Sequence, residues 1–422
     1  MRVHTHTSLF TAIAMITATT IQLGVPNPAS AHHVHVTPPP PVQAAPVDNV
    51  KDFGATGNGS TDDTLAVNNA AADAHNNHKG IFFPPGTYLH NSTLNFNAVP
   101  VTGAGAGSIL LAGSNTNSAV VLTGANVSIQ NLIVSTQNLT GGSTLGNPNS
   151  ASILVQNATS FTVANDTIVQ GQGRFGAYIN TSSVGAVNSC TFDGTGHSGE
   201  AGVVIDQCYN TSVVGNLFQN DFSGVDVYAT GFPSQFIAIM SNTIGNVSYP
   251  TGLVGIGVMG ANGVDVSQNT IQMANATTST EAILFQSVDN FTISQNSTYG
   301  GHVGVGLIQP GPSSNAVSQN VIHNCGGLGI ATNNLPNSAI QIASNAFGEC
   351  GLTDIGLSPA NSVIAVNGSA ASGATSFVQN NSYQGHTNGL NYYITSTFTT
   401  PHLPAANVTG NTQTQTVLTN SI

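Results

Sequence analysis

The stretch DVSQNTI at residues 265–271 recurs, with small changes, along most of the chain. It returns as AIMSNTI at 238–244 and as AVSQNVI at 316–322, and each copy is a β-prone run followed by asparagine, any residue and an apolar residue. The clearest copies place at this point Asn131, Asn216, Asn242, Asn269, Asn320, Asn345 and Asn381. Weaker copies place there Asp166, Cys190 and Asn296, and a last degenerate copy has Asn411. From Asn131 onward the spacings are 35, 24, 26, 26, 27, 27, 24, 25, 36 and 30 residues, so most lie between 24 and 27. A near-constant period of this length is typical of stacked repeats.

A second element lies between the asparagines, in which a glycine precedes alternating apolar residues, as in GVVID at 202–206 and GVDVY at 224–228. Alternation with period two predicts strands with one buried face. One coil of short strands cannot bury that face alone, whereas stacked coils can. Equivalent asparagines would then form ladders in which each amide bonds the coils above and below. The sequence therefore predicts an all-β, single-stranded parallel β-helix of about 11–12 coils, and the constant period disfavours an antiparallel sandwich.

The charge content excludes several classes of protein. The 422 residues include 4 Lys and Arg against 16 Asp and Glu, and charged residues are 5% of the total, where about 25% is usual. Four cations cannot replace the counterions of nucleic acid, so nucleic-acid binding is excluded, and an anionic membrane surface is disfavoured for the same reason. The scarcity of Glu, Lys and Arg argues against a helical protein. A hydrophobic content of 40% argues against disorder.

The ends of the chain suggest export. Residues 1–31 are typical of a signal peptide, with Arg2, an apolar stretch and the small residues Ala29-Ser30-Ala31. The apolar stretch is interrupted by Thr and Gln, so it does not predict a membrane span. We divide the rest into a His/Pro-rich linker at 32–47, an N-terminal cap with the first coils at 48–112, and the β-helix repeats at 113–422. We expect a secreted or cell-surface protein whose oligomeric state is open, a trimer included.

The four cysteines fit an exported protein with one or two disulfides. Cys325 and Cys350 each follow a repeat asparagine by five residues. They should therefore stack on neighbouring coils within disulfide reach. Cys190 and Cys208 lie at different phases of the repeat, so their pairing stays open.

The residues before the repeats form a cap and carry a family resemblance. In VKDFGATGNGSTDDTLAV at 50–67, Thr61 or Asp62 before an apolar run predicts a helix start, and this helix would cover the open end of the β-helix. Together with GIFFPPGTYL at 80–89, the stretch resembles the start of the rhamnogalacturonase/epimerase-type domain of the pectate-lyase-like superfamily. The resemblance implies a right-handed parallel β-helix and a polysaccharide partner. Members of that superfamily include relatives of polygalacturonase, glucanases, uronan epimerases and phage tailspikes.

The catalytic motifs of the polygalacturonase relatives are missing. The coils contain no N-T-D, no D-D pair after it and no R-I-K. Gly196-His197-Ser198-Gly199 is similar to their G-H-G, but it precedes Asp206 and Asp226, which is the wrong order. The catalytic residues of the family therefore cannot be transferred to this chain.

Acidic residues gather in one part of the repeats. Five of the 16 acids fall within 34 residues: Asp193, Glu200, Asp206, Asp221 and Asp226. In the strand elements between the asparagines, alternate residues point outward, and this places five side chains on one outer face: Tyr178, Asn180, Asp206, Asp226 and Tyr228. Asp206 and Asp226 are offset by one coil and two residues, or about 8 Å between Cα atoms. This separation suits the acid and base of an inverting glycoside hydrolase.

We therefore predict Asp206 and Asp226 as the catalytic pair. The supporting acids or loop residues are Asp193, His197, Glu200 and Asp221. The predicted substrate-binding residues are Arg174, Tyr178, Asn180 and Tyr228. The predicted activity is hydrolysis of a neutral or weakly charged polysaccharide, because a negative face repels a polyuronate.

Two other functions fit the same residues. In a non-catalytic adhesin or glycan-binding β-helix, the acids would be a solvated stripe that keeps the face soluble. In a polysaccharide lyase, calcium would bridge the carboxylates to a uronate, and Arg174 would be the only basic side chain within the coils. The histidines show no metal-ligand spacing. We therefore expect no metal or cofactor, apart from calcium in the lyase alternative.

Overall fold

The computed structural model describes the greater part of the chain after the predicted linker. The described residues are 46–113, 117–139, 148–194, 199–247, 254–273, 280–333, 335, 339–350, 362–368, 376–386, 393–398 and 408–416. The predicted signal peptide, residues 1–31, and all but the end of the predicted linker lie outside them.

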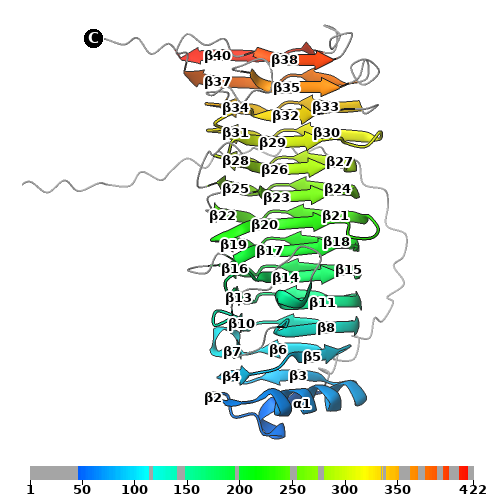
Figure 1. Cartoon of the computed structure of the whole chain (residues 1–422), viewed down its shortest axis with the longest axis vertical. Helices are drawn as coiled ribbons and strands as arrows, with labels where there is room; N and C mark the ends of the chain where they lie inside the picture. Colours follow the sequence, from blue (N-terminus) through cyan, green and yellow to red (C-terminus); the bar gives the residue numbers. More distant parts are fainter. Residues whose placement is uncertain are drawn as a thin grey trace, which may run out of the picture. The chain divides into compact units, whose positions relative to one another are not determined.

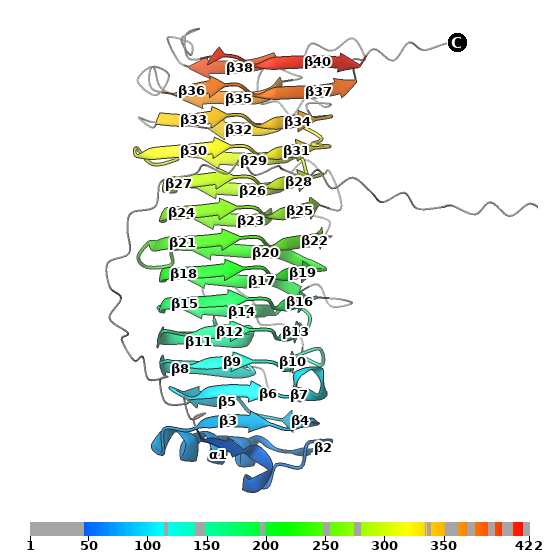
Figure 2. The ribbon, with the colours of Figure 1, turned by 180° about the vertical axis from the view of Figure 1, so that it is seen from behind.

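Strands of successive coils pair in parallel and stack, from β4 near one end to β40 at the other (Figures 1 and 2). Each coil contributes one strand to a sheet that has 14 strands within the described residues. These strands are β2 (Asn58–Asp62), β4 (Gly86–His90), β7 (Ser108–Ala112), β10 (Ile133–Ser135), β13 (Thr167–Val169), β16 (Thr191–Asp193), β19 (Leu217–Gln219), β22 (Thr243–Val247), β25 (Thr270–Met273), β28 (Ser297–Tyr299), β31 (Val321–His323), β34 (Ala346–Gly348), β37 (Ser382–His386) and β40 (Thr412–Thr416).

The second sheet has 26 strands within the same residues. The first two coils give it one strand each, β1 and β3, and each later coil gives it two strands joined by a bend. In the first half of the chain these strands are β1 (Val47–Asn49), β3 (Gly80–Phe83), β5 (Leu94–Asn97), β6 (Pro100–Gly103), β8 (Val120–Ala125), β9 (Ser128–Gln130), β11 (Ala151–Thr159), β12 (Thr162–Ala164), β14 (Phe175–Asn180), β15 (Ser183–Asn188), β17 (Gly199–Asp206) and β18 (Tyr209–Val214). They continue as β20 (Asp221–Tyr228), β21 (Ser234–Met240), β23 (Val254–Met259), β24 (Ala261–Ser267), β26 (Glu281–Gln286), β27 (Asp289–Ser294), β29 (Val303–Ile308), β30 (Ser314–Ser318), β32 (Ile330–Asn333), β33 (Ala339–Ala343), β35 (Ser362–Gly368), β36 (Phe377–Gln379), β38 (Tyr393–Phe398) and β39 (Val408–Thr409).

This arrangement confirms the predicted parallel β-helix. Three strands of the 14-stranded sheet, β2, β4 and β7, precede the first repeat at residue 131. The remaining eleven strands (14 − 3) correspond to the eleven copies of the repeat. The β-helix therefore begins inside the segment expected to hold the cap and first coils.

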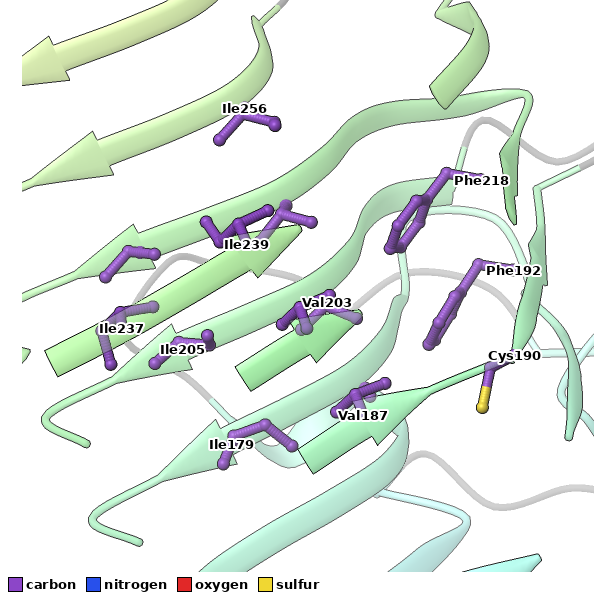
Figure 3. Packing of buried hydrophobic residues seen from close by; sticks show 14 of the residues in the cluster. Ile179, Val187, Cys190, Phe192, Val203, Ile205, Phe218, Ile237, Ile239 and Ile256 are labelled. Atoms are coloured by element: carbon purple, nitrogen blue, oxygen red, sulfur yellow. The ribbon is translucent and has the colours of Figure 1, made fainter. Parts of the chain in front are cut away.

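The core lies inside the coils and is built from the alternating apolar residues. Val203 and Ile205 of β17 are fully buried and belong to one continuous hydrophobic cluster, as the period-two pattern predicts. On the neighbouring strands β16 and β19 of the 14-stranded sheet, Phe192 and Phe218 stack with ring centroids 4.9 Å apart (Figure 3). Equivalent side chains of neighbouring coils therefore lie above one another and pack into one continuous core.

Buried asparagines form a continuous ladder at the bend that follows β18 and its equivalents. The Asn269 Nδ2 atom donates to Ile239 O at 2.8 Å and to Asn296 Oδ1 at 2.9 Å. Its Oδ1 accepts from the backbone N and the Nδ2 of Asn242, both at 3.0 Å. The same pattern links Asn216, Asn242, Asn269, Asn296, Asn320, Asn345, Asn381 and Asn411. Each buried amide is thus satisfied by the neighbouring coils.

The first repeat is shifted by one residue from its expected place. Leu132, and not Asn131, occupies the ladder position, because the Leu132 N–H donates to Asp166 Oδ1 at 3.0 Å. Asn131 precedes the ladder position, where the backbone has a left-handed conformation with φ of 59°. Gln268, before Asn269, has the same conformation with φ of 59°. Asparagine adopts this left-handed conformation more readily than most residues. Asn131 therefore suits the position before the ladder, and its occurrence in the motif wrongly suggested the ladder position itself.

The helix α1 (Thr64–Asn76) covers the N-terminal end of the stack, beside β3 and β5, and buries Val67 and three alanines (Figure 1). The N-cap residue is Asp63, one residue after the predicted Asp62, and Asp62 Oδ1 accepts the Thr64 N–H at 3.0 Å. The Asp63 carboxylate instead accepts the backbone N–H groups of Thr56 and Gly57, at 2.7 and 3.0 Å. The acidic pair of the cap therefore fixes local structure. Three short 3-10 helices are η1 (Val50–Phe53), η2 (Gly105–Gly107) and η3 (Pro148–Ser150).

Cys325 and Cys350 form a disulfide between adjacent coils, with Cα atoms 4.4 Å apart. Cys190 and Cys208 are buried free thiols. They cannot meet, because Cys190 is at the ladder position, where its N–H donates to Asn216 Oδ1, whereas the Cys208 N–H bonds Ser234 Oγ at another bend.

The structure also bears on the membrane. No helix in the described part of the chain is long and apolar enough to cross a bilayer; α1 has 13 residues.

Replacing Asn269 by alanine should strongly destabilise the protein. The change leaves the Asn242 amide and Ile239 O without their buried partners, and each unpaired buried group costs about 1–3 kcal/mol. We expect a drop of several degrees in the calorimetric Tm. The matched control is Gln268→Ala, because Gln268 is exposed and its side chain bonds only exposed groups among those described, Ser241 Oγ and Gln295 Oε1. Equal effects of the two changes would contradict the importance of the buried ladder.

Asp166→Asn should stabilise the protein in a pH-dependent way. Burial raises the pKa of Asp166 to about 8, and its Oδ2 has no hydrogen-bond partner. The folded state therefore binds this proton more tightly than the unfolded state, and wild-type stability falls as pH rises from about 4 to 8. The gain in stability, seen as a higher Tm, should be smallest near pH 4 and largest at pH 8, where it is on the order of a few kcal/mol. A gain that does not change with pH would contradict this origin.

Candidate functional site

The predicted site lies on the outer face of β14, β17 and β20. The strand register aligns Tyr178 with Val204 and Asp226, and it aligns Asn180 with Asp206 and Tyr228. Asp206 and Asp226 are therefore offset by one coil and two residues, as the sequence indicates. Their surroundings, however, differ sharply.

Asp206 holds neighbouring segments in place. Its side chain is 1% exposed. The carboxylate accepts hydrogen bonds from Tyr178 Oη at 3.2 Å, Asn180 Nδ2 at 3.3 Å, and the N–H and Oγ1 of Thr230 at 3.1 and 2.7 Å. These bonds use both oxygens and fix the connection between β20 and β21. The expected catalytic role of Asp206 does not agree with this environment, because a reacting carboxyl group must reach the substrate.

Asp226 has the properties of a proton donor at neutral pH. Its side chain is 8% exposed, and Oδ1 accepts the Ser223 hydroxyl at 2.8 Å. Burial raises the pKa of Asp226 to about 7, hydrogen bonds from Ser223 and Tyr228 oppose this rise, and the nearby Glu200 carboxylate adds to it. A carboxyl group tuned to this range can hold a proton and release it during a reaction.

A glycine on the next coil lies directly against the Asp226 carboxyl group. Gly257 of β23 lies opposite Asp226 in the register. A Cβ atom at Gly257 would lie 2.7 Å from Asp226 Oδ1, so any other residue would crowd the carboxyl group. The next residue in this row is Leu284, followed by a second glycine, Gly306. The Asp226 carboxyl group therefore occupies the place that a side chain at Gly257 would take.

Glu200 is the second carboxylate of this group. It lies on β17 and is half-buried. Its charge contributes to the raised pKa values of both Asp226 and Tyr228. The site therefore pairs Asp226 with Glu200.

Strand alternation could not have placed Glu200, because the strand bends at Gly202. A Cβ atom at Gly202 would lie 2.3 Å from the core ring of Phe218, so Gly202 faces inward. Val203 also faces the core. Two consecutive inward positions break the period of two, and residues before the bend no longer follow the pattern of those after it.

Two predicted substrate-binding residues are buried, and we correct their roles. Arg174 is 0% exposed, and its Nη2 donates to Asn117 O at 2.7 Å. Burial lowers the pKa of its guanidinium to about 10. Tyr178 is also 0% exposed and packs edge-on against Phe175 with centroids 5.3 Å apart, so it offers no ring face to a sugar. Asn180 and Tyr228 are half-buried, and their predicted contacts with substrate stay predictions.

The remaining acids form a second group. Asp221, the first residue of β20, is 3% exposed, and burial together with the Asp193 carboxylate raises its pKa well above the usual value. Asp193 is half-buried at the end of β16. The acidic cluster of the sequence is thus two groups, one near Asp226 and one near Asp221. His197 lies outside the described residues.

Metal-ligand groups and cavities are the other features of the structure that bear on binding. The described residues contain no group of three or more His, Cys, Asp or Glu side chains placed to hold a metal. A cavity of about 610 Å³ lies near the N-terminal end, lined by residues that include Val47, Lys79 and Thr102. None of the acids discussed above lines it, and Lys79 Nζ is paired with Asp48 and Asp73 at 2.8 and 2.9 Å.

Comparison with known proteins identifies the class. Residues 47–248 match the family model described as rhamnogalacturonase A/epimerase, pectate lyase-like. The match covers slightly less than half of the chain and agrees with the resemblance of its N-terminal cap. The fold itself is that of a parallel β-helix, shared with solved structures.

Individual relatives are more distant. A stretch of 51 residues is 47% identical to a probable glucan endo-1,3-beta-glucosidase of Arthroderma benhamiae, and it spans 10% of this chain and 6% of that protein. The A-module of the mannuronan C-5 epimerase AlgE6 of Azotobacter vinelandii superposes with a TM-score of 0.64 at 16% identity, over 87% of this chain and 99% of that chain. PfbA, a surface adhesin of Streptococcus pneumoniae, gives 0.60 at 15% identity, over 86% and 94%. These two structures share the fold.

Asparagine substitutions should separate the two aspartates of the outer face. At pH 8, Asp226→Asn should raise the Tm, because it removes a carboxylate that burial disfavours. The gain should vanish near pH 3, where the wild-type group is mostly protonated in both the folded and the unfolded state. Asp206→Asn should lower the Tm by the equivalent of about 1–3 kcal/mol, because its amide N–H₂ would face hydrogen-bond donors. Thermal melts at both pH values measure this. A loss of stability in Asp226→Asn at both values would contradict the assignment.

Proposed function

We propose that the protein is a secreted carbohydrate-active enzyme that hydrolyses a neutral or weakly charged polysaccharide on the outer face of β17 and β20. Asp226 acts as the general acid, and Glu200 is the partner carboxylate. The observation that carries this proposal is the Asp226 carboxyl group, whose pKa is raised to about 7 beside a second carboxylate.

The proposed chemistry needs two carboxyl groups in different protonation states. Protonated Asp226 donates its proton to the glycosidic oxygen as the bond to the leaving sugar breaks. Ionised Glu200 stabilises the positive charge that develops on the other sugar, or activates the attacking water. Its negative charge also favours the protonated form of Asp226. Tyr228, which contacts Asp226, would orient the acid.

Charge favours a neutral substrate over a polyuronate. The outer face carries the Glu200 and Asp226 carboxyl groups. Arg174 is buried and directed to Asn117 O. A substrate on the outer face therefore could not reach Arg174, the basic side chain that the lyase alternative requires. The matched glucan endo-1,3-beta-glucosidase segment supports a glucan as the first substrate to test.

The test is a substrate screen with the full chain. The polysaccharides are β-1,3-glucan, α-1,3-glucan, other neutral glycans, alginate and pectin, and the readouts are reducing ends and unsaturated uronate absorbance. We expect reducing ends from a neutral glycan, and a loss of about 10²–10⁴-fold in kcat with Asp226→Asn. Activity should fall as pH rises above about 7, because Asp226 loses its proton. Asp52→Asn, an exposed change in η1, is the matched control and should retain activity.

Other outcomes would support the two alternatives. Uronate absorbance from alginate or pectin would contradict hydrolysis and favour a lyase. Glycan binding without release of reducing ends from any substrate would contradict catalysis and favour an adhesin. Full activity of Asp226→Asn would place the acid elsewhere.

A further inference from the structure

The outer face that carries Asp226 is closed on its N-terminal side. The strand register aligns Asp226 with Val204, Tyr178 and Leu154 of the three preceding coils. Val204 and Tyr178 are 0% exposed, and Leu154 is 3% exposed. These three side chains belong to an apolar cluster that is separate from the core inside the coils. A substrate therefore cannot lie against the outer face on this side of Asp226.

The same face continues on the C-terminal side of Asp226, over β23, β26, β29 and β32 (Figure 1). Two outward rows cross these strands, and the core residues Val258, Phe285 and Leu307 lie between them. The row of Asp226 continues with Gly257, Leu284, Gly306 and Ala331. The row of Tyr228 continues with Met259, Gln286, Ile308 and Asn333. These eight residues are called the C-terminal strip below, and four coil spacings give it a length of about 19 Å from Asp226.

The side chains of the C-terminal strip are accessible, unlike those on the other side of Asp226. Met259 is 37% exposed and Asn333 is exposed, whereas Leu284, Gln286 and Ile308 are half-buried. Met259 is offset from Asp226 by one coil and two residues, so the two Cα atoms lie about 8 Å apart. An accessible apolar side chain therefore lies close enough to contact a sugar that also meets the carboxyl group.

Glycines flatten this surface. A Cβ atom at Gly257 would lie 2.7 Å from Asp226 Oδ1, and a Cβ atom at Gly306 would lie 3.3 Å from Leu284 Cδ1. The Asp226 and Leu284 side chains therefore lie along the face, over the glycine of the next coil. Apolar groups with a few polar groups beside them are typical of ligand sites. Such a surface suits a sugar ring, which has apolar C–H faces and hydroxyl groups at its edge.

The C-terminal strip carries no charged side chain. No Lys or Arg follows Arg174 in the sequence. Glu281 borders the strip, because its Cγ would lie 3.5 Å from a Cβ atom at Gly306. Its carboxylate can accept a hydrogen bond from a hydroxyl group but repels another carboxylate. The strip therefore favours an uncharged glycan over a polyuronate.

We propose that the C-terminal strip binds the neutral polysaccharide chain, and that Met259 packs against the sugar unit beside Asp226. This inference rests on the proposed function and adds a direction to it, because the chain extends from Asp226 towards β32. Met259 is a binding residue, since its flexible, polarisable thioether packs well against apolar groups but has no proton to transfer.

The test is glycan binding by the full chain with Asp226→Asn, which prevents cleavage during the measurement. The probes are soluble β-1,3-glucan and α-1,3-gluco-oligosaccharides, titrated by calorimetry. We expect at least one probe to bind, and Met259→Ala in the same protein to raise its Kd about tenfold through the lost apolar contact. Met259→Leu conserves the volume and should retain the affinity. The matched control is Val321→Ala, because Val321 is 39% exposed but lies on β31 of the other sheet.

Kinetics give a second readout where Asp226 is intact. Met259→Ala should raise KM for the bound glucan and leave kcat unchanged, as expected when a contact is lost equally from the ground state and the transition state. A matching fall in kcat would contradict a binding role for Met259.

Three binding results would overturn the proposal. The first is that neither glucan binds the Asp226→Asn protein. The second is a Kd that Met259→Ala does not change, and the third is an equal rise of Kd in Val321→Ala. A Kd that depends on Met259 in a protein that hydrolyses no glycan would support the strip and contradict the proposed hydrolysis alone. Hydrolysis with a Kd independent of Met259 would contradict the strip alone.

Discussion

The buried asparagine ladder is the interaction on which the structure depends. An amide at this bend cannot satisfy its donors and acceptor within its own coil, and it is paired only when another coil stands above and below. An unpaired buried amide costs more free energy than one hydrogen bond gains. The coils are therefore stable only as a stack. The same requirement explains why α1 covers the N-terminal end and why the period of the sequence is so regular.

The N-terminal part of the ladder shows what happens when the asparagine is replaced. Leu132 can only use its backbone N–H there, and Asp166 accepts that N–H but has no N–H₂ group to donate. Cys190 fills the third position as a small buried group, and its N–H still bonds Asn216. Amides also replace charges on the outside, where Gln268, Gln295 and Gln319 bond one another along the stack. This is the physical reason for a chain with so few charged residues.

Burial has opposite consequences for two aspartates of the same face. Asp206 accepts hydrogen bonds from three residues and serves to position the segment at Thr230. Asp226 has fewer donors and a carboxylate neighbour, so its pKa rises to about 7. A sequence pattern that places both on the outer face cannot separate these roles, because the hydrogen bonds come from neighbouring coils. Glu200 was identified as an acid of the cluster, but only the bend at Gly202 shows that it belongs with Asp226.

The sequence by itself determined the architecture of this protein. Its period, its alternating strands and its repeat asparagines are local patterns. Because they recur from coil to coil, they can be recognised in the amino-acid sequence alone. The pairing of Cys325 with Cys350 followed from the same period. Only the tertiary structure decided which polar side chains are buried, as with Arg174, Tyr178 and Asp221. The environments of these side chains are made by residues one or two coils away. Burial and hydrogen bonding across coils therefore cannot be predicted from the residue and its sequence neighbours.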